Sequence, residues 1–313
     1  MREALVAGDC IGPFSHLPPG PGMDEEGALM GAADGAIFTR HRVKVGGFEI
    51  SYLHGGHDGA MAPALSLHGM GGAGKWEAYH MALGTVTQTY VPQLPGWPEG
   101  QLPAGIGSVQ DYTALVLEFL DAIGTDRVIL FGHSIGGWIA LQVATMHPDR
   151  VSRLILVDAM GLDLPSAPAL DLQTLDEESF AKAVFGRLGL IATAQAYGFG
   201  AEWENVRRGP EFERQWKGRG LVASLVQGPC GDAELAHMVQ SISAESLLIW
   251  GRLDGVVPLQ HGEILRATLP HARMDVIDRC GHLPMVEKPE TFHRLLYDFL
   301  FGIEEEIPDV VKV

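Results

Sequence analysis

The chain has few cysteines, few basic residues and no long apolar run. Its three cysteines, Cys10, Cys230 and Cys280, lie far apart in 313 residues, so they form neither a C-x-x-C pair nor a disulfide framework. Acidic residues outnumber basic ones by 39 to 22, and the formal net charge of −17 repels polyanions such as nucleic acids. No segment has the length of a membrane span, and the N-terminus lacks the apolar core of a secretory signal. We therefore expect a cytoplasmic protein that binds neither nucleic acid nor membrane.

Strand and helix patterns alternate from about residue 40 onward. Two segments separated by Gly46-Gly47, 40–45 and 48–53, predict a hairpin. The apolar runs 127–132, 153–158 and 245–251 are typical of strands buried on both faces of a parallel sheet. Between such runs lie amphipathic segments with helical spacing, among them 108–124 and 289–301. The pattern predicts the α/β class, with a mostly parallel sheet and helices on both faces.

Composition divides the chain into four parts. Residues 1–38 are rich in Gly and Pro and predict an irregular arm. Residues 39–160 and 241–303 carry the alternating pattern of an α/β core, and 304–313 form a tail. Residues 161–240 interrupt the alternation with helical segments, 176–189 and 232–242, but no convincing buried strand. Such an insertion predicts a helical cap above the carboxyl edge of the sheet, where ligands of these folds bind.

The strongest chemical signal is the hexapeptide GHSIGG at 132–137. It contains G-x-S-x-G, follows the strand RVILF directly and opens the helical pattern WIALQVA. In that context a sharp strand-to-helix turn exposes Ser134, and small residues on each side let neighbouring backbone pass close. The helix N-terminus behind it favours negative charge. We interpret Ser134 as a nucleophile.

A second glycine-rich loop, HGMGGAGKW at 68–76, permits two interpretations. Gly69 to Lys75 satisfies the phosphate-binding pattern G-x-x-x-x-G-K, and LILVD at 154–158 could supply an aspartate for Mg²⁺. However, Trp76 stands where that pattern requires a Ser or Thr hydroxyl. The alternative is a loop that offers a backbone N–H to a developing oxyanion, and we favour it.

A nucleophilic serine needs a base and an orienting acid. His282 lies in DRCGHLPMVEKP, between the expected last strand and the last helix, and Asp254 follows the strand SLLIW. The chain order Ser, Asp, His is the order used by α/β hydrolases. Asp158, which ends the strand LILV, stays open as a rival acid.

Residues 40–301 resemble an α/β-hydrolase-fold serine hydrolase with a helical cap, through HGMGG, GHSIGGW, GRLDGVVP and CGHLPMVEKP in family order. The resemblance implies Ser134 as nucleophile, His282 as general base and acid, and Asp254 as the group that orients the imidazole. It also implies an oxyanion hole made by the N–H groups of Ile135 and Met70. It implies no metal and no cofactor.

The substrate is defined less sharply. Four apolar residues that flank these loops, Trp138, Met160, Val256 and Leu283, predict a largely apolar pocket beneath an aromatic cap. We expect a small-molecule carboxylic ester as substrate, as in esterases and lipases. The arm or the cap could also join copies of the chain in a homo-oligomer.

The alternative is a hydrolase that cleaves carbon–carbon bonds of ring-fission products. A basic run in the cap, Arg207, Arg208, Arg214, Lys217 and Arg219, could bind a substrate carboxylate. That family usually has Asn before the nucleophile and Trp after the catalytic histidine, where this chain has His133 and Leu283. An acyltransferase, a lyase or a binding protein with the same triad also stays open.

Overall fold

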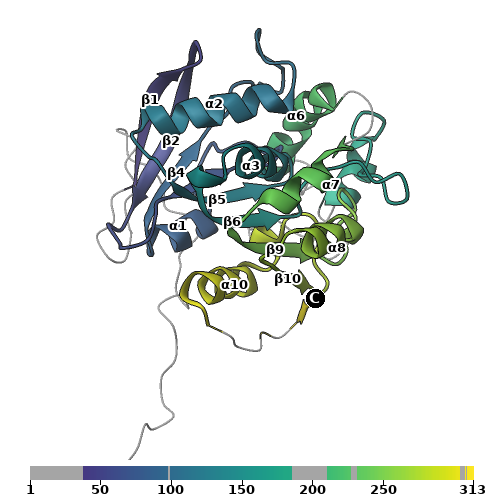
Figure 1. Cartoon of the computed structure of the whole chain (residues 1–313). Helices are drawn as coiled ribbons and strands as arrows, with labels where there is room; N and C mark the ends of the chain where they lie inside the picture. Colours follow the sequence, from purple (N-terminus) through teal and green to yellow (C-terminus); the bar gives the residue numbers. More distant parts are fainter. Residues whose placement is uncertain (1–37, 98, 185–209, 227–230, 304–306, 308) are drawn as a thin grey trace, which may run out of the picture.

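The computed structural model describes residues 38–313 except 98, 185–209, 227–230, 304–306 and 308 (Figure 1). Its main sheet has the strands β1 (Thr39–Val45), β2 (Phe48–Gly56), β3 (Ala64–Leu67), β4 (Gln88–Pro92), β5 (Val128–His133), β6 (Val151–Val157), β9 (Glu245–Gly251), β10 (Ala272–Ile277) and β11 (Val310–Lys312). Two short strands, β7 (Gly161–Leu162) and β8 (Gly231–Asp232), pair with each other in a separate small sheet.

The described helices are α1 (Ala78–Gly84), α2 (Val109–Ala122), α3 (Ile135–Met146), α6 (Pro210–Leu225), α7 (Leu235–Met238), α8 (Leu259–Thr268), α9 (Pro284–Glu287) and α10 (Pro289–Phe301). Residues 177–184 are helical as well, and 3₁₀ turns cover Pro148–Arg150 and Val239–Ser241.

The strands of the main sheet run in the order β1-β2-β4-β3-β5-β6-β9-β10-β11. Neighbours from β4 to β10 pair in parallel, while β1, β2 and β11 add antiparallel edges. Because β3, β5, β6, β9 and β10 are parallel, their carboxyl ends meet at one edge. The loops after β3, β5, β9 and β10 are those that carry the motifs found in the sequence.

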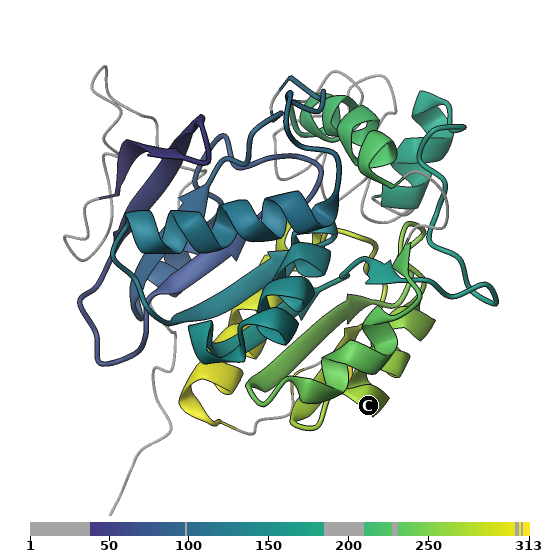
Figure 2. The ribbon, with the colours of Figure 1, turned by 45° about the horizontal axis from the view of Figure 1, so that its top comes forward.

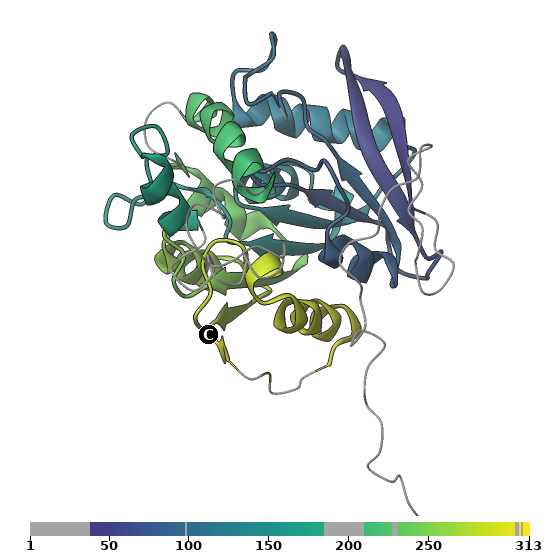
Figure 3. The ribbon, with the colours of Figure 1, turned by 180° about the vertical axis from the view of Figure 1, so that it is seen from behind.

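Helices form a layer on each face of the sheet (Figures 1 and 2). α2 and α3 contact each other on one face, and α1 and α10 contact each other on the opposite face. Seen from behind, α10 and α1 lie in front of the sheet (Figure 3). With helices on both faces, β5 is buried at every residue, which explains its unbroken apolar sequence.

Local sequence fixes the ends of α2. Ser108 caps its N-terminus and accepts a hydrogen bond from the Asp111 N–H, while the Asp111 carboxylate accepts from the Ser108 N–H, so the two form a capping box. Gly124, just after the helix, has a φ of +71° in the left-handed region that glycine tolerates.

The structure differs from the expected elements in several places. The segment predicted as one helix at 232–242 begins with the last residue of β8 and contains α7 and a 3₁₀ turn. The paired strands β7 and β8 were not expected. The sequence reading also missed α8 and β11, the latter within the predicted tail. β11 is only three residues long and is recognisable by its pairing with β10, so periodicity could not reveal it.

Several predictions fall on residues outside the described part. This group contains residues 1–37 of the predicted arm, residues 185–189 of the predicted helix 176–189, and the aromatic residues Phe185, Tyr197, Phe199 and Trp203 of the predicted cap. None of the helices in the described ranges is both long and apolar enough to cross a membrane.

His293 on α10 supplies a test of the packing of this helix. Its side chain is buried, Nε2 has no hydrogen-bond partner among the described residues, and burial lowers its pKa from 6.5 to about 4. The unfolded chain therefore binds a proton below about pH 6.5 that the folded chain does not bind, and stability falls as the pH drops toward 4.

We predict that His293→Leu flattens this dependence. Between about pH 7 and about pH 5, the free energy of unfolding should fall by roughly 2 kcal/mol less in the variant than in the wild type. Urea unfolding at both pH values measures the difference. His237→Leu, at an exposed histidine, is the control and should leave the slope unchanged. An equal slope in all three proteins would contradict the neutral, buried state of His293.

Candidate active site

Ser134 stands at a tight turn between β5 and α3. Its φ of 54° and ψ of −119° are strained for a residue with a side chain. Glycines make the turn sterically feasible: a Cβ on Gly132 would lie 2.5 Å from the Gly136 carbonyl oxygen, and one on Gly136 would lie 2.4 Å from the Leu67 oxygen. The G-x-S-x-G spacing therefore reflects close backbone approach on both sides of Ser134.

The structure brings Ser134, His282 and Asp254 into one hydrogen-bonded chain. His282 Nε2 lies 2.9 Å from Ser134 Oγ, and His282 Nδ1 lies 2.8 Å from Asp254 Oδ2. All three come from loops at the carboxyl edge of the sheet, after β5, β9 and β10. Ser134 is 1% exposed and the His282 side chain is 0% exposed, so the chain of hydrogen bonds is shielded from water. This geometry can transfer a proton from the serine hydroxyl to the imidazole.

Asp254, rather than its rival Asp158, contacts the imidazole. The other oxygen of Asp254, Oδ1, accepts hydrogen bonds from the N–H groups of Val256 at 2.7 Å and Val257 at 3.0 Å. These two donors hold the carboxylate in a fixed orientation toward His282. Asp158 is fully buried nearby, at the end of β6.

The predicted oxyanion donors lie on two sides of Ser134. Ile135 is the first residue of α3, where an N–H group has no acceptor within the helix. Met70 follows the Gly69 carbonyl, which accepts a hydrogen bond from His68 Nδ1 at 2.7 Å. Because a trans peptide points its N–H opposite its C=O, this bond fixes the direction of the Met70 N–H.

Two further contacts hold this loop. His68 Nε2 accepts from the Leu94 N–H at 3.1 Å, so the ring is neutral with its proton on Nδ1, and burial lowers its pKa to about 4. The indole of Trp97 donates to the Met70 carbonyl at 2.8 Å. The sequence reading expected His68 to shape its loop but did not identify Trp97, which lies far from any motif.

Glu287 and His133 hold the loop that carries His282. The Glu287 carboxyl accepts hydrogen bonds from the N–H groups of Gly281 and Leu283, on either side of the histidine. Burial raises the pKa of Glu287 to about 7. His133 Nε2 donates to the His282 carbonyl at 2.9 Å, and burial lowers the pKa of His133 to about 3. The sequence reading missed Glu287, although it belongs to the same motif as His282.

Residues of the predicted cap dock on these loops. The carbonyls of Ala183 and Val184 accept hydrogen bonds from the N–H groups of Gly255 and His282. Helix α6 packs on the other side, where a Cβ on Gly218 would lie 1.6 Å from the Met70 oxygen. The segment between β6 and β9 therefore contacts three loops of the site. These are the loops that carry His282, Asp254 and Met70.

The four residues predicted to bind substrate are placed differently. Met160 lines a cavity of about 300 Å³, and Leu283 lines a second cavity together with His68, His133 and Arg214. Val256 and Trp138 have structural contacts instead. Val256 donates to Asp254, while the Trp138 ring packs against Gly161.

The basic run of the predicted cap also separates into different roles. Arg207 and Arg208 lie outside the described residues, Lys217 pairs with Glu213 at the surface, and Arg219 stacks on Trp216. Arg214 alone among the described members lines a cavity at the predicted oxyanion loop. It lies 3.2 Å from Glu77, whose carboxylate also lies 3.6 Å from Lys75.

The features of the phosphate-loop hypothesis have other roles in the structure. Trp76 is buried against Phe38 with ring centroids 4.5 Å apart, and Lys75 is partly exposed beside Glu77. Within the described chain, His133, Asp158 and His282 form one group with metal-ligand atoms within 4.8 Å of one another. Both ring nitrogens of His282 are already hydrogen-bonded, to Asp254 and Ser134, so the group belongs to the same network.

Comparison with known proteins gives concordant matches. The family model described as alpha/beta hydrolase fold matches residues 65–289. The chain is 29% identical over 266 residues to a 2-hydroxy-6-oxo-6-phenylhexa-2,4-dienoate hydrolase of Burkholderia cepacia, covering 79% of this chain and 91% of the relative. It is also 29% identical over 267 residues to a 2-hydroxy-6-oxononadienedioate/2-hydroxy-6-oxononatrienedioate hydrolase of Paraburkholderia phymatum. This match covers 82% of this chain and 92% of the relative.

Solved structures agree with the fold. A meta-cleavage product hydrolase from Pseudomonas fluorescens matches with a TM-score of 0.65 and 20% identity over 84% of this chain and 98% of that chain. A bacterial membrane phospholipase A matches with a TM-score of 0.65 and 26% identity. This match covers 86% of this chain and 87% of the phospholipase chain.

His68 supplies a test of how the loop at Met70 is held. We predict that His68→Ala lowers kcat for a p-nitrophenyl ester by roughly tenfold to a hundredfold with little change in KM, because a misdirected N–H donor weakens transition-state stabilisation. His68→Asn, whose amide can donate to the Gly69 carbonyl, should retain most of the activity.

Steady-state kinetics of both variants, with circular dichroism as a check of folding, make the comparison. The exposed-site variant His237→Leu serves as control. If His68→Ala and His68→Asn lose the same activity, the hydrogen bond to Gly69 is not the reason for the effect.

Proposed function

Since this chain belongs to the α/β hydrolase fold family, we propose that it cleaves a carbon–carbon bond in a 2-hydroxy-6-oxo-dienoate. In this proposal Ser134 is the nucleophile, His282 the general base and acid, and Asp254 the group that orients the imidazole. The proposal takes its substrate class from the relatives, which align with this chain over about nine-tenths of their own length.

The observation that carries the proposal is the position of Arg214. Its guanidinium lines the cavity bounded by His68, Gly69 and Leu283, beside the predicted oxyanion loop. Arg214 lies 3.2 Å from Glu77, and Glu77 lies 3.6 Å from Lys75, so two basic side chains and one carboxylate gather beside this cavity. A partly buried guanidinium is suited to bind a carboxylate by charge-assisted hydrogen bonds. A dienoate carries its carboxylate at the end remote from the scissile ketone, whereas a simple ester carries none.

The chemistry follows from the substrate class. Ser134 Oγ attacks the C6 carbonyl and His282 takes its proton, while the N–H groups of Met70 and Ile135 stabilise the oxyanion. When the C5–C6 bond breaks in the 2-oxo-3-ene tautomer, its electron pair delocalises through C3–C5 to the C2 oxygen. The imidazolium protonates this leaving group. Water, activated by His282, then hydrolyses the acyl-serine and releases the acid.

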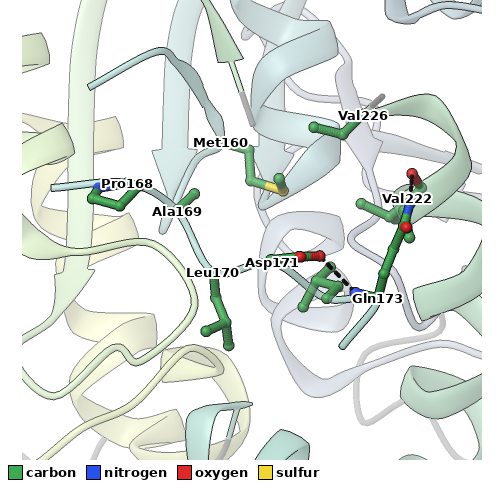
Figure 4. Close-up of a pocket in the computed structure, with 10 residues that line it drawn as sticks. Met160, Pro168, Ala169, Leu170, Asp171, Gln173, Val222 and Val226 are labelled. Carbon is green, nitrogen blue, oxygen red and sulfur yellow. Dashed lines mark hydrogen bonds between the residues drawn. The ribbon is translucent and has the colours of Figure 1, made fainter. Parts of the chain in front are cut away.

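The cavity beside Met160 suits the substituent at C6. Met160 is tied to the nucleophile, since its N–H donates to the Ser134 carbonyl at 3.0 Å. The cavity of about 300 Å³ lies between the chain that follows β7 and helix α6, and eight of its ten lining residues are apolar (Figure 4). Asp171 is the charged residue of this lining. A neutral aromatic or alkyl substituent is therefore favoured over a second carboxylate.

Ester hydrolysis is the second candidate, on a specific observation. The chain has His133 and Leu283 where carbon–carbon hydrolases usually have Asn and Trp. In the structure His133 binds the His282 carbonyl, and Leu283 lines the cavity with Arg214. The similarity to a phospholipase A at 26% identity also favours acyl-ester chemistry. Acyl transfer or lyase activity on the same triad would use the same first step.

We predict that the wild type cleaves 2-hydroxy-6-oxo-6-phenylhexa-2,4-dienoate with a kcat/KM at least about fivefold above that for 2-hydroxy-6-oxononadienedioate, because repulsion by Asp171 costs roughly 1 kcal/mol. Loss of the dienoate absorbance measures both rates. Ser134→Ala should abolish turnover and fluorophosphonate labelling while leaving the circular dichroism spectrum intact.

Short p-nitrophenyl esters are assayed in parallel. Rapid ester hydrolysis by an enzyme that leaves both dienoates intact would favour the second candidate. A folded wild type without an adduct at Ser134 would contradict both.

We also predict that Arg214→Gln raises KM for the phenyl dienoate by roughly tenfold to a hundredfold, the usual cost of one charge-assisted hydrogen bond. The kcat/KM for p-nitrophenyl acetate, which has no carboxylate, should stay within about threefold. Lys217→Gln, on the same helix but paired at the surface, is the matched control. An equal loss on both substrates would show that Arg214 supports the structure and not carboxylate binding.

A further inference from the structure

Asp158 is a buried carboxylic acid that the proposed mechanism does not use. It ends β6, beside β9, and its N–H donates to the Ile249 carbonyl at 3.1 Å. The residue is 0% exposed and has a φ of 43°, in the left-handed region. Its Oδ1 accepts a hydrogen bond from the Gly251 N–H at 2.9 Å. The strained turn and this bond direct the carboxyl toward the loop that follows β9.

The Asp254 carboxyl is the group that faces it there. Both carboxyls lie beside the imidazole: a carboxyl oxygen of Asp158 lies within 4.8 Å of a ring nitrogen of His282, and Asp254 Oδ2 lies 2.8 Å from His282 Nδ1. The charge of Asp254 acts on Asp158, whose Oδ2 has no donor among the described residues. Two ionised carboxylates close together in a dry interior repel strongly, so the pair keeps one proton. A proton on one of the two would turn this repulsive contact into a hydrogen bond and satisfy the unpartnered oxygen.

The unequal surroundings decide which of the two holds the proton. Asp254 accepts two backbone N–H bonds and a bond from His282, so three donors face its carboxyl. Asp158 accepts one backbone N–H bond. Burial, followed by the charge of Asp254, raises the pKa of Asp158 well above its usual value.

We propose that Asp158 is a positioning residue of the reaction: its carboxyl carries a proton and donates it in a hydrogen bond to the Asp254 carboxylate. This contact adds a side-chain donor to the Val256 and Val257 amides that already hold the acceptor of the His282 N–H. It also means that His282 faces one negative charge at this corner of the site and not two. The inference rests on the proposed role of the triad but not on the identity of the substrate.

Other titratable groups surround the pair. Glu287 on α9 is negatively charged above its pKa of about 7 and also acts on Asp158. Cys280 is buried near both aspartates, and burial raises the pKa of its thiol, so it adds no charge. His133, together with Asp158 and His282, belongs to the group within 4.8 Å, and burial keeps it neutral. The charges that act on Asp158 are therefore negative and favour its protonated form.

The test compares Asp158→Asn with Asp158→Ala in hydrolysis of p-nitrophenyl acetate. The Asn amide can donate to Asp254 and its oxygen can accept from Gly251, so we expect kcat within about threefold of wild type. Asp158→Ala removes the donor, and we expect kcat to fall roughly tenfold with KM unchanged. Asp275→Asn, at another buried carboxyl on β10 away from the site, is the control and should match the wild type.

The pH profile of kcat/KM separates a neutral Asp158 from an ionised one. If Asp158 is neutral, Asp158→Asn removes no charge and the acidic limb of the profile stays in place. If Asp158 is ionised, the same variant removes a negative charge near the imidazole and moves this limb to lower pH, which would overturn the proposal. Equal activity of the Asn and Ala variants would overturn it as well.

Infrared spectroscopy gives a readout that needs no activity. At about pH 8, where Glu287 with its pKa of about 7 is mostly ionised, the difference spectrum of wild type minus Asp158→Asn should contain a carboxylic acid C=O band that shifts in D₂O. A carboxylate band in its place would exclude the protonated state. Fluorophosphonate labelling of Ser134 tests the triad separately, so failure of the proposed function and failure of this inference give different results.

Discussion

The backbone turn at Ser134 is the constraint on which the site depends. With φ at 54°, the turn places the hydroxyl above the sheet edge and starts α3 directly behind it. It is sterically feasible only because Gly132 and Gly136 carry no Cβ where neighbouring backbone lies within about 2.5 Å. The flanking strand is buried at every residue and the helix is buried from Ile135 to Ala144, and this packing offsets the strain of the turn. Any rearrangement that relaxed Ser134 would also disturb the packing of β5 against β3 and β6.

The same edge collects several polar groups that are withdrawn from water, and their protonation states follow from their partners. His68 and His133 are neutral, and each donates to a backbone carbonyl of a loop in the site. Among the described residues, the Asp254 carboxyl accepts three hydrogen bonds from N–H groups, whereas the Asp158 carboxyl accepts one. Burial penalises every uncompensated charge, so the negative charge concentrates where the donors are. That place is the acceptor of the His282 imidazole.

The sequence predicted the architecture well because its signals are local. Membership of the α/β hydrolase fold family and the parallel sheet with two helix layers are confirmed. G-x-S-x-G, GRLDG and CGHLP each lie directly after a buried strand, and parallel strands bring such loops together without further information. The substrate reading was less successful, since the relatives favour carbon–carbon bond hydrolysis over the expected ester.

What the sequence did not reveal depends on contacts between distant segments. Trp97 binds Met70 from a loop without a motif, and Arg214 reaches the site from a helix with weak periodicity. The basic residues of the predicted cap look alike in sequence, but Arg214, Lys217 and Arg219 have different surroundings in the structure. Asp158 and Asp254 were alternatives for one role, but the structure places both at the site with unequal partners, and no pattern of letters distinguishes the two environments.

In the proposed function, substrate choice depends on residues around Ser134, His282 and Asp254 and not on these three residues themselves. Attack, oxyanion stabilisation and acyl transfer are common to ester and ketone substrates, so Ser134, His282 and Asp254 cannot discriminate between them. A dienoate differs by a remote carboxylate and a leaving group that must delocalise an electron pair. A positive charge at the carboxylate end would bind the dienoate and not a simple ester. In the proposed function Arg214, which lies beside Glu77 on the cavity at the predicted oxyanion loop, supplies this charge.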